Sequence, residues 1–399
     1  MNAWRDIWAD LRVHPGRTVL TAVSLFLGVV AVMAIVATGD VVREVFVAQA
    51  EQQGGRLQTF ERTVALPPSA GKGDLVAAIG HLPAPGGADA ACRVEPSSGL
   101  QVALTAVTSP LNPRQGAAGA ITPVIVCGDY RAIYRLPLSQ GRWLADDQAT
   151  APYEAVLNRP AATQYGGPGT TLWLVGDATP TAFPVRVVGV VNDGASTPNL
   201  YTGAVPWLAN APQLVTAASV TLLWRQTPAT DREIKAATDD WLIDHGLPTD
   251  SVVMETDQVA QYREFIALLQ WAFAGVAVLS LAVAALGIVN VGLASVRERA
   301  HELVIRRALG ASTWSIVRMI MGSALLLSVI VAAAAATAVW GGLAAFRATL
   351  AYDSPVTPPV YPAHAAALGV GVSVLTALVG SLVPGLVAAR LQPGLALRD

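Results

Sequence analysis

Four long stretches of the chain are apolar and uncharged, and they alternate with polar segments. Thr18–Gly39 has no charged side chain over 22 residues, and Phe265–Val296 has none over 32 residues. A helix of about 20 apolar residues crosses the hydrocarbon core of a bilayer. Two further stretches of this kind follow towards the carboxyl end. The pattern predicts transmembrane helices at 18–39, 264–296, 318–346 and 363–389.

The region at 40–263 has a different pattern, with short apolar runs separated by proline, glycine and threonine. Short runs rich in β-branched residues and bounded by turn residues indicate strands. At about 220 residues, the region can hold one or two compact subdomains. Lys72–Gly80 has the pattern of a short helix. The predicted strands are Gln58–Leu66, Val102–Val107, Ile121–Val126, Leu172–Val175, Val185–Val191 and Val220–Trp224.

A second helix is predicted after Thr230. Thr230 and Glu233 form the T-x-x-E pattern of a capping box, and Gly246 suits the end of the helix. A strand is expected at Ser251–Glu255, which completes a β-α-β unit. The predicted buried face of this helix consists of Ile234, Ala237, Trp241 and Leu242.

The amino-terminal segment 1–17 is amphipathic and carries arginine. Arg5, Arg12 and Arg17 precede the first apolar stretch, which predicts a cytoplasmic amino terminus. We expect a helix lying on the inner membrane surface, and a helix that binds a partner would have the same pattern. The stretch that follows is longer than the roughly 7–15 apolar residues of a cleaved signal peptide, so we expect it to be retained. The apolar face consists of Trp4, Ile7, Trp8 and Leu11.

The segment 297–317 lies between the second and third apolar stretches and is basic. Five arginines and two glutamates lie between Arg297 and Arg318. Cytoplasmic loops carry such an excess, so we expect this segment and both chain ends in the cytosol, and region 40–263 outside. The lack of proline predicts a helix that ends near Gly310. Residues 347–362 are rich in proline, and we expect them to form an outer loop; we expect residues 390–399 to form a cytoplasmic tail.

Composition agrees with a membrane protein. The chain has 399 residues, of which 53% are hydrophobic and 14% are charged, and its mean hydropathy is +0.47. Charged residues usually make up about 25% of a soluble domain. The net charge of −2 does not supply the basic surface typical of nucleic-acid binding. We therefore expect membrane lipids among the partners and no nucleic acid.

The basic segment also carries an extended motif. It resembles the V-x-E-R-x-x-E-I-x-I-R-x-A-L-G-A signature of FtsX-like permeases, the membrane subunits of MacB/LolC-type ABC transporters. Leu303 replaces the usual isoleucine and Val304 the usual glycine. Shorter similarities occur at Gly141-Arg142, at Val185–Val190 and in the tail AARLQPGLALRD. The motif occupies Val296, Glu298, Arg299, Glu302, Leu303, Ile305, Arg306, Ala308, Leu309, Gly310 and Ala311.

The resemblance implies a fold and an assembly. The fold has four transmembrane helices and a large α+β extracytoplasmic domain between helices 1 and 2, with porter-like β-α-β units and an inserted strand-rich lobe. Two permease chains, identical or paralogous, would pair in the inner (cytoplasmic) cell membrane on two copies of a separate ABC ATPase. That ATPase would bind ATP and Mg²⁺, and this chain would need no cofactor.

The resemblance also implies a mechanism. Closure of the ATPases would move the helix after the second span, and this motion would drive export of a peptide, drug or lipid-linked substrate by mechanotransmission. A basic loop that only fixes topology would carry the same charge excess, so the role of the segment stays open at this point. The residues expected to couple to the ATPase are Glu298, Arg299, Glu302, Leu303, Ile305, Arg306, Arg307, Leu309 and Gly310.

Other functions leave different signatures in a sequence. The chain has no G-x-x-x-x-G-K-[ST] phosphate loop, and Ile305 stands where a second histidine would complete H-E-x-x-H after His301. We therefore expect no catalytic residue and no metal site. The alternative function is an FtsX-like regulator that activates cell-wall hydrolases, which would need an extracytoplasmic partner protein. A membrane sensor without an ATPase is a third hypothesis.

Cys92 and Cys127 are the only cysteines of the chain. Both fall in the region expected outside the cytosol, where an oxidising compartment favours pairing. Sequence spacing does not determine the distance between two side chains, so a disulfide and two buried free thiols both remain open.

Overall fold

The computed structural model divides into two compact units. The helical unit comprises Met1–Arg43, Phe265–Leu350 and Pro358–Asp399, and the sheet unit comprises Glu44–Glu264 and Ala351–Thr357. The predicted helix at 1–17 falls outside the described residues up to position 14. The structure describes residues 15–67, 72–96, 100–103, 117–145, 153–176, 182–210, 217–225, 230–256, 259–298, 300–308, 310, 312–361 and 363–390.

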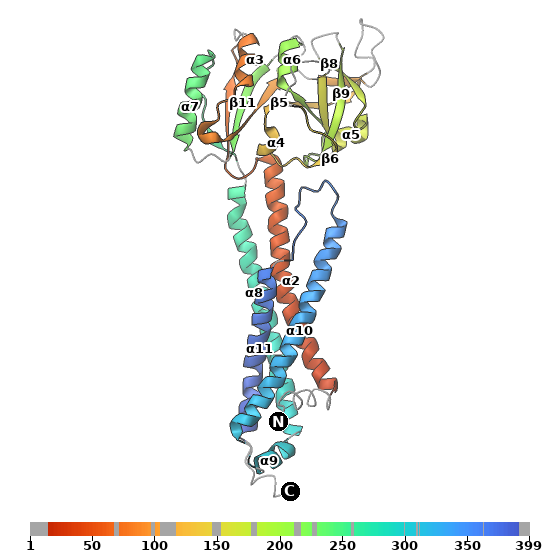
Figure 1. Cartoon of the computed structure of the whole chain (residues 1–399), viewed down its shortest axis with the longest axis vertical. Helices are drawn as coiled ribbons and strands as arrows, with labels where there is room; N and C mark the ends of the chain where they lie inside the picture. The colour runs from red at the N-terminus through yellow and green to blue at the C-terminus, as the bar shows by residue number, and fades with distance from the viewer. Residues whose placement is uncertain are drawn as a thin grey trace. The chain divides into compact units, whose positions relative to one another are not determined.

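The described strands of the sheet unit form one mixed sheet (Figure 1). Its order is β12-β1-β11-β2-β5-β10-β7-β9-β8-β3-β4, and β6 pairs with β9 off this path. The bounds are β1 Thr59–Ala65, β2 Asp89–Pro96, β3 Leu100–Ala103, β4 Ala117–Ala120, β5 Thr122–Gly128, β6 Leu138–Gly141, β7 Tyr153–Asn158, β8 Thr171–Gly176, β9 Ala182–Val191, β10 Asn199–Gly203, β11 Ala217–Arg225 and β12 Met254–Glu255. Each predicted strand overlaps one of these, and residues 104–107 of the second lie outside the described part.

Two β-α-β units form one end of the sheet. Helix α3 (Lys72–Gly80) connects β1 to β2, and helix α7 (Asp231–Asp244) connects β11 to β12. Strands β1 and β2 both pair antiparallel with β11, so they run parallel to each other. Strands β11 and β12 both pair antiparallel with β1, on opposite sides of it, so they also run parallel to each other. The order β12-β1-β11-β2 is that of a split β-α-β arrangement, with the strand-rich lobe inserted between β2 and β11. The predicted α+β architecture is confirmed.

Helix α7 begins as the sequence predicts. The Thr230 amide donates to Glu233 Oε2 at 2.7 Å, and the Glu233 amide donates to Thr230 Oγ1, so both halves of the capping box form. Ile234 and Leu242 are buried, but the prediction for Ala237 was wrong. Ala237 is exposed and Thr238 takes the buried position, because its hydroxyl is needed by a buried arginine.

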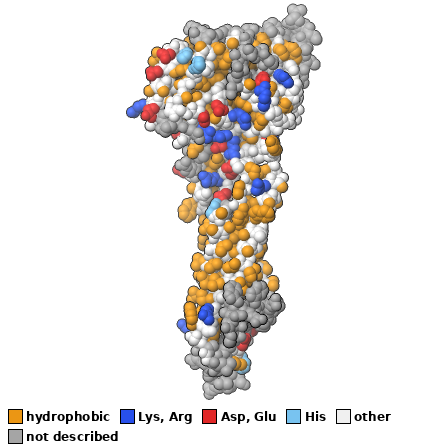
Figure 2. Space-filling model, viewed as in Figure 1, with side chains coloured by type: hydrophobic (Ala, Val, Ile, Leu, Met, Phe, Trp, Pro, Cys, Tyr) orange, Lys and Arg blue, Asp and Glu red, His pale blue; other side chains and the backbone are white. Residues whose placement is uncertain are grey.

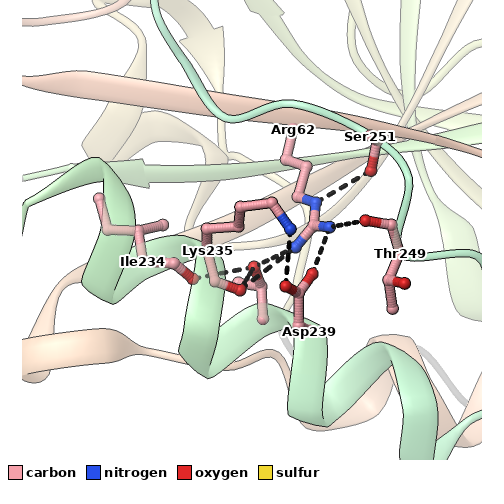
Figure 3. A network of polar contacts seen from close by, with 7 residues as sticks. Arg62, Ile234, Lys235, Asp239, Thr249 and Ser251 are labelled. Atoms are coloured by element: carbon pink, nitrogen blue, oxygen red, sulfur yellow. Dashed lines mark hydrogen bonds and ion pairs between the residues drawn. The ribbon is translucent and has the colours of Figure 1, made fainter.

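That arginine is Arg62, on β1, which Figure 3 shows with its polar partners. Its side chain is fully buried. Its guanidinium donates to Asp239 Oδ1 and Thr238 Oγ1, both at 2.5 Å, and to Thr249 O at 2.8 Å. Its Nε donates to Ser251 Oγ at 2.9 Å. These bonds explain why β12 is shorter than the predicted strand Ser251–Glu255: the chain at 249–251 turns towards Arg62 instead of pairing with β1.

The sheet is buried on both faces. Along β11, Leu222 and Trp224 belong to the larger apolar cluster, and Leu223 between them belongs to the smaller one. Helices α3, α7, α5 (Arg159–Tyr165) and α6 (Ala204–Asn210) contribute to the larger cluster, and α4 (Tyr130–Ile133) contributes to the smaller. Figure 1 shows α3 and α6 on one side of the sheet and α4 on the other. Alternating side chains therefore serve two cores, as expected for a strand covered on both sides.

Close backbone packing explains the Gly141-Arg142 similarity. Gly141 ends β6 with φ +69° and pairs with Gly189 of β9. A Cβ at Gly141 would lie 2.1 Å from the carbonyl oxygen of Val188, and a Cβ at Gly189 would lie 2.1 Å from that of Arg142. Both positions therefore need glycine.

The two cysteines face each other across the sheet. Cys92 of β2 is the direct partner of Cys127 of β5, and the structure joins them in a disulfide with a Cα–Cα distance of 5.0 Å. The bond links the split β-α-β end of the sheet to the inserted lobe.

Four helices are long and apolar enough to cross a membrane: α2 (Pro15–Gln53), α8 (Val259–Glu298), α10 (Thr313–Thr349) and α11 (Ala363–Ala389). Large apolar side chains cover their outer faces (Figure 2), and Trp271 and Trp340 are 78% and 61% exposed. Each of the first three helices extends beyond its predicted span, and α11 continues through Pro384 to Ala389. The prediction of four transmembrane helices is confirmed.

The helical unit packs through small residues. A Cβ at Gly28 of α2 would lie 2.8 Å from Ala284 Cβ of α8. Ser373 of α11 donates to the backbone oxygen of Ser328 of α10 at 3.0 Å. Small residues let helix backbones approach closely where lipid removes the hydrophobic drive for association. Leu25, Val29, Met33, Ile288, Val331 and Ala335 form part of the apolar cluster between these helices.

Candidate functional site

The motif segment folds as a short helix, α9 (Ala300–Ala308), between α8 and α10. Gly310 follows with φ +96°, a left-handed conformation that suits the end of a helix. Ser312 then caps α10 by accepting from the amide of Ser315 at 3.2 Å. The segment is therefore a helix with defined elements on both sides, as the sequence predicts.

The exposed residues of α9 include both charged and apolar side chains. Glu298, at the end of α8, and Glu302 are exposed, and Ile305 is 47% exposed. Val304, which stands where the motif usually has glycine, is buried at 7% exposure. Among the large apolar residues of α9 whose side chains the structure describes, Val304 is buried and Ile305 is exposed.

Not every predicted coupling residue can be placed. Arg299 and Leu309 lie outside the described residues. Leu303, Arg306 and Arg307 belong to α9, and the structure describes only their backbone.

The segment is held at its base by the adjoining long helices. Val296 of α8, Ile316 of α10 and Ala388 of α11 form a small buried cluster, with Met319 and Ile320 packed against it. Gly292 of α8 lies so close to Pro384 of α11 that a Cβ would meet the proline ring at 2.5 Å. This packing joins the ends of three long helices near the point where α9 begins.

Sequence reasoning missed a second group of residues, in the sheet unit. Asp353 lies in the loop between α10 and α11, and Arg159 Nε donates to its Oδ2 at 2.6 Å. The two residues are 194 positions apart. One feature of the sequence could have indicated a role for Asp353: it is the only charged residue among 348–362.

Among the described residues, the structure contains no group of three or more His, Cys, Asp or Glu side chains that could hold a metal ion. Burial raises the pKa of Tyr201, and the neighbouring carboxylate of Asp193 raises it further. The ring lies in the smaller core, and its hydroxyl donates to Asp193 Oδ2 at 2.8 Å, so the perturbed tyrosine has a structural partner.

The fold and the exposed segment define a multi-pass membrane protein with an extracytoplasmic domain between its first and second spans. Residues 18–239 match the MacB-like periplasmic core domain, and residues 274–393 match the FtsX-like permease C-terminal domain. The first match alone covers more than half of the chain. The chain therefore belongs to the family of MacB-type, FtsX-like permeases.

Named relatives agree with this assignment. The chain is 29% identical over 414 residues to the "Macrolide export ATP-binding/permease protein MacB 1/2" of Paracoccus denitrificans (strain Pd 1222), covering 100% of this chain and 58% of that protein. It is 27% identical over 427 residues to the "Pyoverdine export ATP-binding/permease protein PvdT" of Pseudomonas entomophila (strain L48), covering 99% of this chain and 58% of that protein. The chain thus spans less than two thirds of the length of these relatives.

Two solved structures are similar to about half of this chain. The periplasmic region of MacB from Actinobacillus actinomycetemcomitans is 18% identical with a TM-score of 0.36, covering 53% of this chain and 95% of that one. The extracellular domain of the transporter YknZ from Gram-positive bacteria is 16% identical with a TM-score of 0.34, covering 49% of this chain and 99% of that one.

Proposed function

We propose that this chain is the permease of an ABC exporter and that α9 is the surface on which the ATPase docks. The observation that carries the proposal is the division of α9, with Val304 buried while Glu302 and Ile305 are exposed. A partner helix or groove could bury Ile305 and pair with the charged residues around it. Family membership supplies the class of partner, because the named relatives are ATP-binding/permease proteins.

The 399 residues contain no phosphate loop, so ATP and Mg²⁺ would be bound by an ATPase outside this sequence. Two ATPase copies would serve two permease chains, identical or paralogous, in the cytoplasmic membrane with the chain ends and α9 inside. The substrate would be a peptide, drug or lipid-linked compound. The named relatives are export proteins, so regulation of a cell-wall hydrolase is not favoured.

Mechanotransmission is part of this proposal, and the continuity of the helices supports it. Helix α8 runs unbroken for 40 residues, from Val259 to Glu298, which is about 60 Å at 1.5 Å per residue. Its first six residues belong to the sheet unit and its last residues adjoin α9. A push on α9 would therefore reach the sheet unit along one rigid element.

The test is Glu302→Arg. An added arginine strengthens the cytoplasmic charge bias, so insertion and folding are expected to stay normal. Reversal of a charge at the docking surface is expected to lower ATPase co-purification about tenfold or more, or to leave ATP hydrolysis uncoupled from transport. His301→Arg is the matched control, because it adds a positive charge at an exposed neighbouring position of α9.

Membrane insertion, co-purified ATPase and transport-dependent growth would be compared for the two variants. Normal assembly together with normal transport in Glu302→Arg would contradict the docking assignment. Equal loss in both variants would show that α9 responds to added charge in general, as a topology signal does.

A further inference from the structure

The loop between α10 and α11 is part of the sheet unit, although both helices belong to the helical unit. Ala351–Thr357 groups with Glu44–Glu264, and we call this segment the docked loop. Its largest side chain, Tyr352, is 96% exposed, whereas Asp353 is 5% exposed. Polar contacts of Asp353, and not burial of the aromatic ring, therefore hold the centre of the loop.

The carboxylate of Asp353 has partners from two elements. Arg159, the first residue of α5, donates to it through both Nε and Nη2 in a bidentate pair. Ser139 of β6 donates its hydroxyl to the same carboxylate. Asn192 Nδ2 donates to the backbone oxygen of Asp353 at 3.0 Å. A planar guanidinium that grips both carboxylate oxygens determines orientation as well as distance.

Two of the three residues that hold Asp353, Arg159 and Asn192, are adjacent in sequence to a buried polar network. Asn158, next to Arg159, donates to Asp193, next to Asn192, at 3.1 Å from each carboxylate oxygen. Asn158 also caps α5 by accepting from the amide of Ala161 at 3.0 Å. Asn158 and Asp193 are 0% and 8% exposed. Buried, satisfied networks of this kind are rigid, so Arg159 and Asn192 are presented to the loop in fixed positions.

A second contact holds the end of the docked loop. Arg135 Nη2 donates to Thr357 Oγ1 at 2.6 Å and to Glu44 Oε1 at 2.7 Å, and its Nη1 donates to Glu51 Oε2 at 3.0 Å. The amide of Thr357 donates to Glu44 Oε1 at 3.1 Å. The carboxyl-terminal part of α2 and the docked loop are therefore joined through one arginine.

We propose that Asp353 is a positioning residue for transport: its pair with Arg159 fastens the ends of α10 and α11 to the sheet unit, so that these helices and the sheet unit move together. This inference rests on the proposed export function. Helices α2 and α8 enter the sheet unit as continuous helices, whereas α10 and α11 reach it only through the irregular chain between Thr349 and Ala363. Arg135 holds the end of that chain at Thr357, and the Asp353–Arg159 pair holds its centre. With the pair formed, all four long helices are attached to one body; without it, the part of the chain before Thr357 is free to lengthen or shorten and so to absorb motion.

An open groove lies beside the Asp353–Arg159 pair, so probes can be attached next to the docked loop. It has a volume of about 530 Å³ and is lined in part by Gln140, Thr163 and Tyr352. The Arg159 side chain is 48% exposed there. The native cysteines form the disulfide Cys92–Cys127, so introduced cysteines can be labelled selectively.

The first experiment tests the fastening without an ATPase. Nitroxide labels at Tyr352→Cys and Asp240→Cys, both exposed positions of the sheet unit, report the distance from the loop to α7 in the full chain in nanodiscs. We expect one narrow distance in the parent protein and a broad distribution in Asp353→Asn and Arg159→Ala. The charge swap Arg159→Asp with Asp353→Arg is expected to narrow it again.

Arg142→Ala is the matched control, because Arg142 is a half-exposed arginine of the same unit that pairs with Glu154. It is expected to leave the distance narrow, and circular dichroism would verify that each variant is folded. A broad distribution in the parent, or an unchanged one in both Asp353→Asn and Arg159→Ala, would overturn the proposal.

The second experiment adds the ATPase and follows labels at Asp240→Cys and Gly341→Cys. Gly341 lies on α10 and has no atom within 4 Å of a Cβ, so a label fits there. If α10 follows the sheet unit, ATP turnover is expected to leave this distance distribution nearly unchanged in the parent and to broaden it in Asp353→Asn. Broadening in both proteins would refute the concerted motion, while failure to bind any ATPase would contradict the proposed function and leave the first experiment valid.

Discussion

The two units are held in their folds by different means. Buried polar residues of the sheet unit include Arg62, Asn158, Asp193 and Asp353, and each is hydrogen-bonded to at least one side chain 35 or more positions away. Buried polar residues of the helical unit, within the described part of the chain, are the hydroxyls of Ser328, Ser373, Thr376 and Ser381. The bonds of Ser328 and Ser381 reach back to carbonyls of their own helices.

The difference follows from the surroundings of each unit. In water, burial of apolar area drives compaction, and polar networks then select one arrangement of the core. In lipid that drive is absent between helices, so close approach of small residues determines the packing. The sheet unit should therefore be sensitive to the loss of charged partners, and the helical unit to added volume.

The largest effect is expected from Arg62→Met. The substitution removes the buried guanidinium and leaves Thr238 and the carbonyl oxygen of Thr249 without this donor. Asp239 keeps Lys235 as a partner, so the cost comes from the acceptors that lose this donor, about 1–3 kcal/mol of unfolding free energy for each. Urea unfolding of the full chain, followed by tryptophan fluorescence, would measure it. Arg142→Met, which affects an exposed pair, is the control and should cost no more than about 1 kcal/mol.

Arg62→Met should also change how the stability of the protein responds to acid. Burial raises the pKa of Asp239, but hydrogen bonds from Lys235 and Arg62 lower it more, so the pKa lies below its usual value. A lowered carboxyl pKa stabilises the folded state at neutral pH, and this stability is lost as the pH falls through about 4 and below. Arg62→Met should flatten that part of the pH profile; an unchanged profile would show that Arg62 does not hold the carboxylate.

A somewhat smaller effect is expected from the loss of the disulfide. Cys92 and Cys127 are 35 positions apart, and both are buried. Opening a loop of this length in Cys92→Ala with Cys127→Ala is expected to lower the unfolding free energy by about 3–4 kcal/mol in the loop-entropy description. Reductant should lower the urea midpoint of the parent protein and leave the double variant unchanged. Two titratable thiols in the unfolded, unreduced parent would contradict this prediction.

The smallest effect tests the helical unit. In Gly28→Val the new side chain meets Ala284, whose Cβ would be 2.8 Å from the added Cβ. Overpacking of this kind costs about 1–3 kcal/mol. Gly39→Val on the same helix is the control, because no atom lies within 4 Å of its Cβ. Thermal unfolding in detergent should give a lower midpoint for Gly28→Val than for Gly39→Val. Adding Ala284→Gly to Gly28→Val should restore the midpoint. Equal midpoints for the two single variants would mean that the contact between Gly28 and Ala284 is not tight.

Sequence alone determined the features whose physics is local. An uncharged run identifies a membrane helix because each residue in it must tolerate hydrocarbon, and the four predicted spans correspond to α2, α8, α10 and α11. The cap at Thr230 and the glycine after α9 were predictable because each involves residues a few positions apart. The motif identified α9 as the candidate docking helix.

Only the tertiary structure decided which distant groups meet. Thr238 and not Ala237 is buried on α7 because Arg62, 176 positions earlier, needs an acceptor there. Asp353 meets Arg159 because β6, α5 and the turn after β9 converge on the loop between α10 and α11. Periodicity reports which side of an element is apolar, and it carries no information on which polar group another part of the chain will bring to that side.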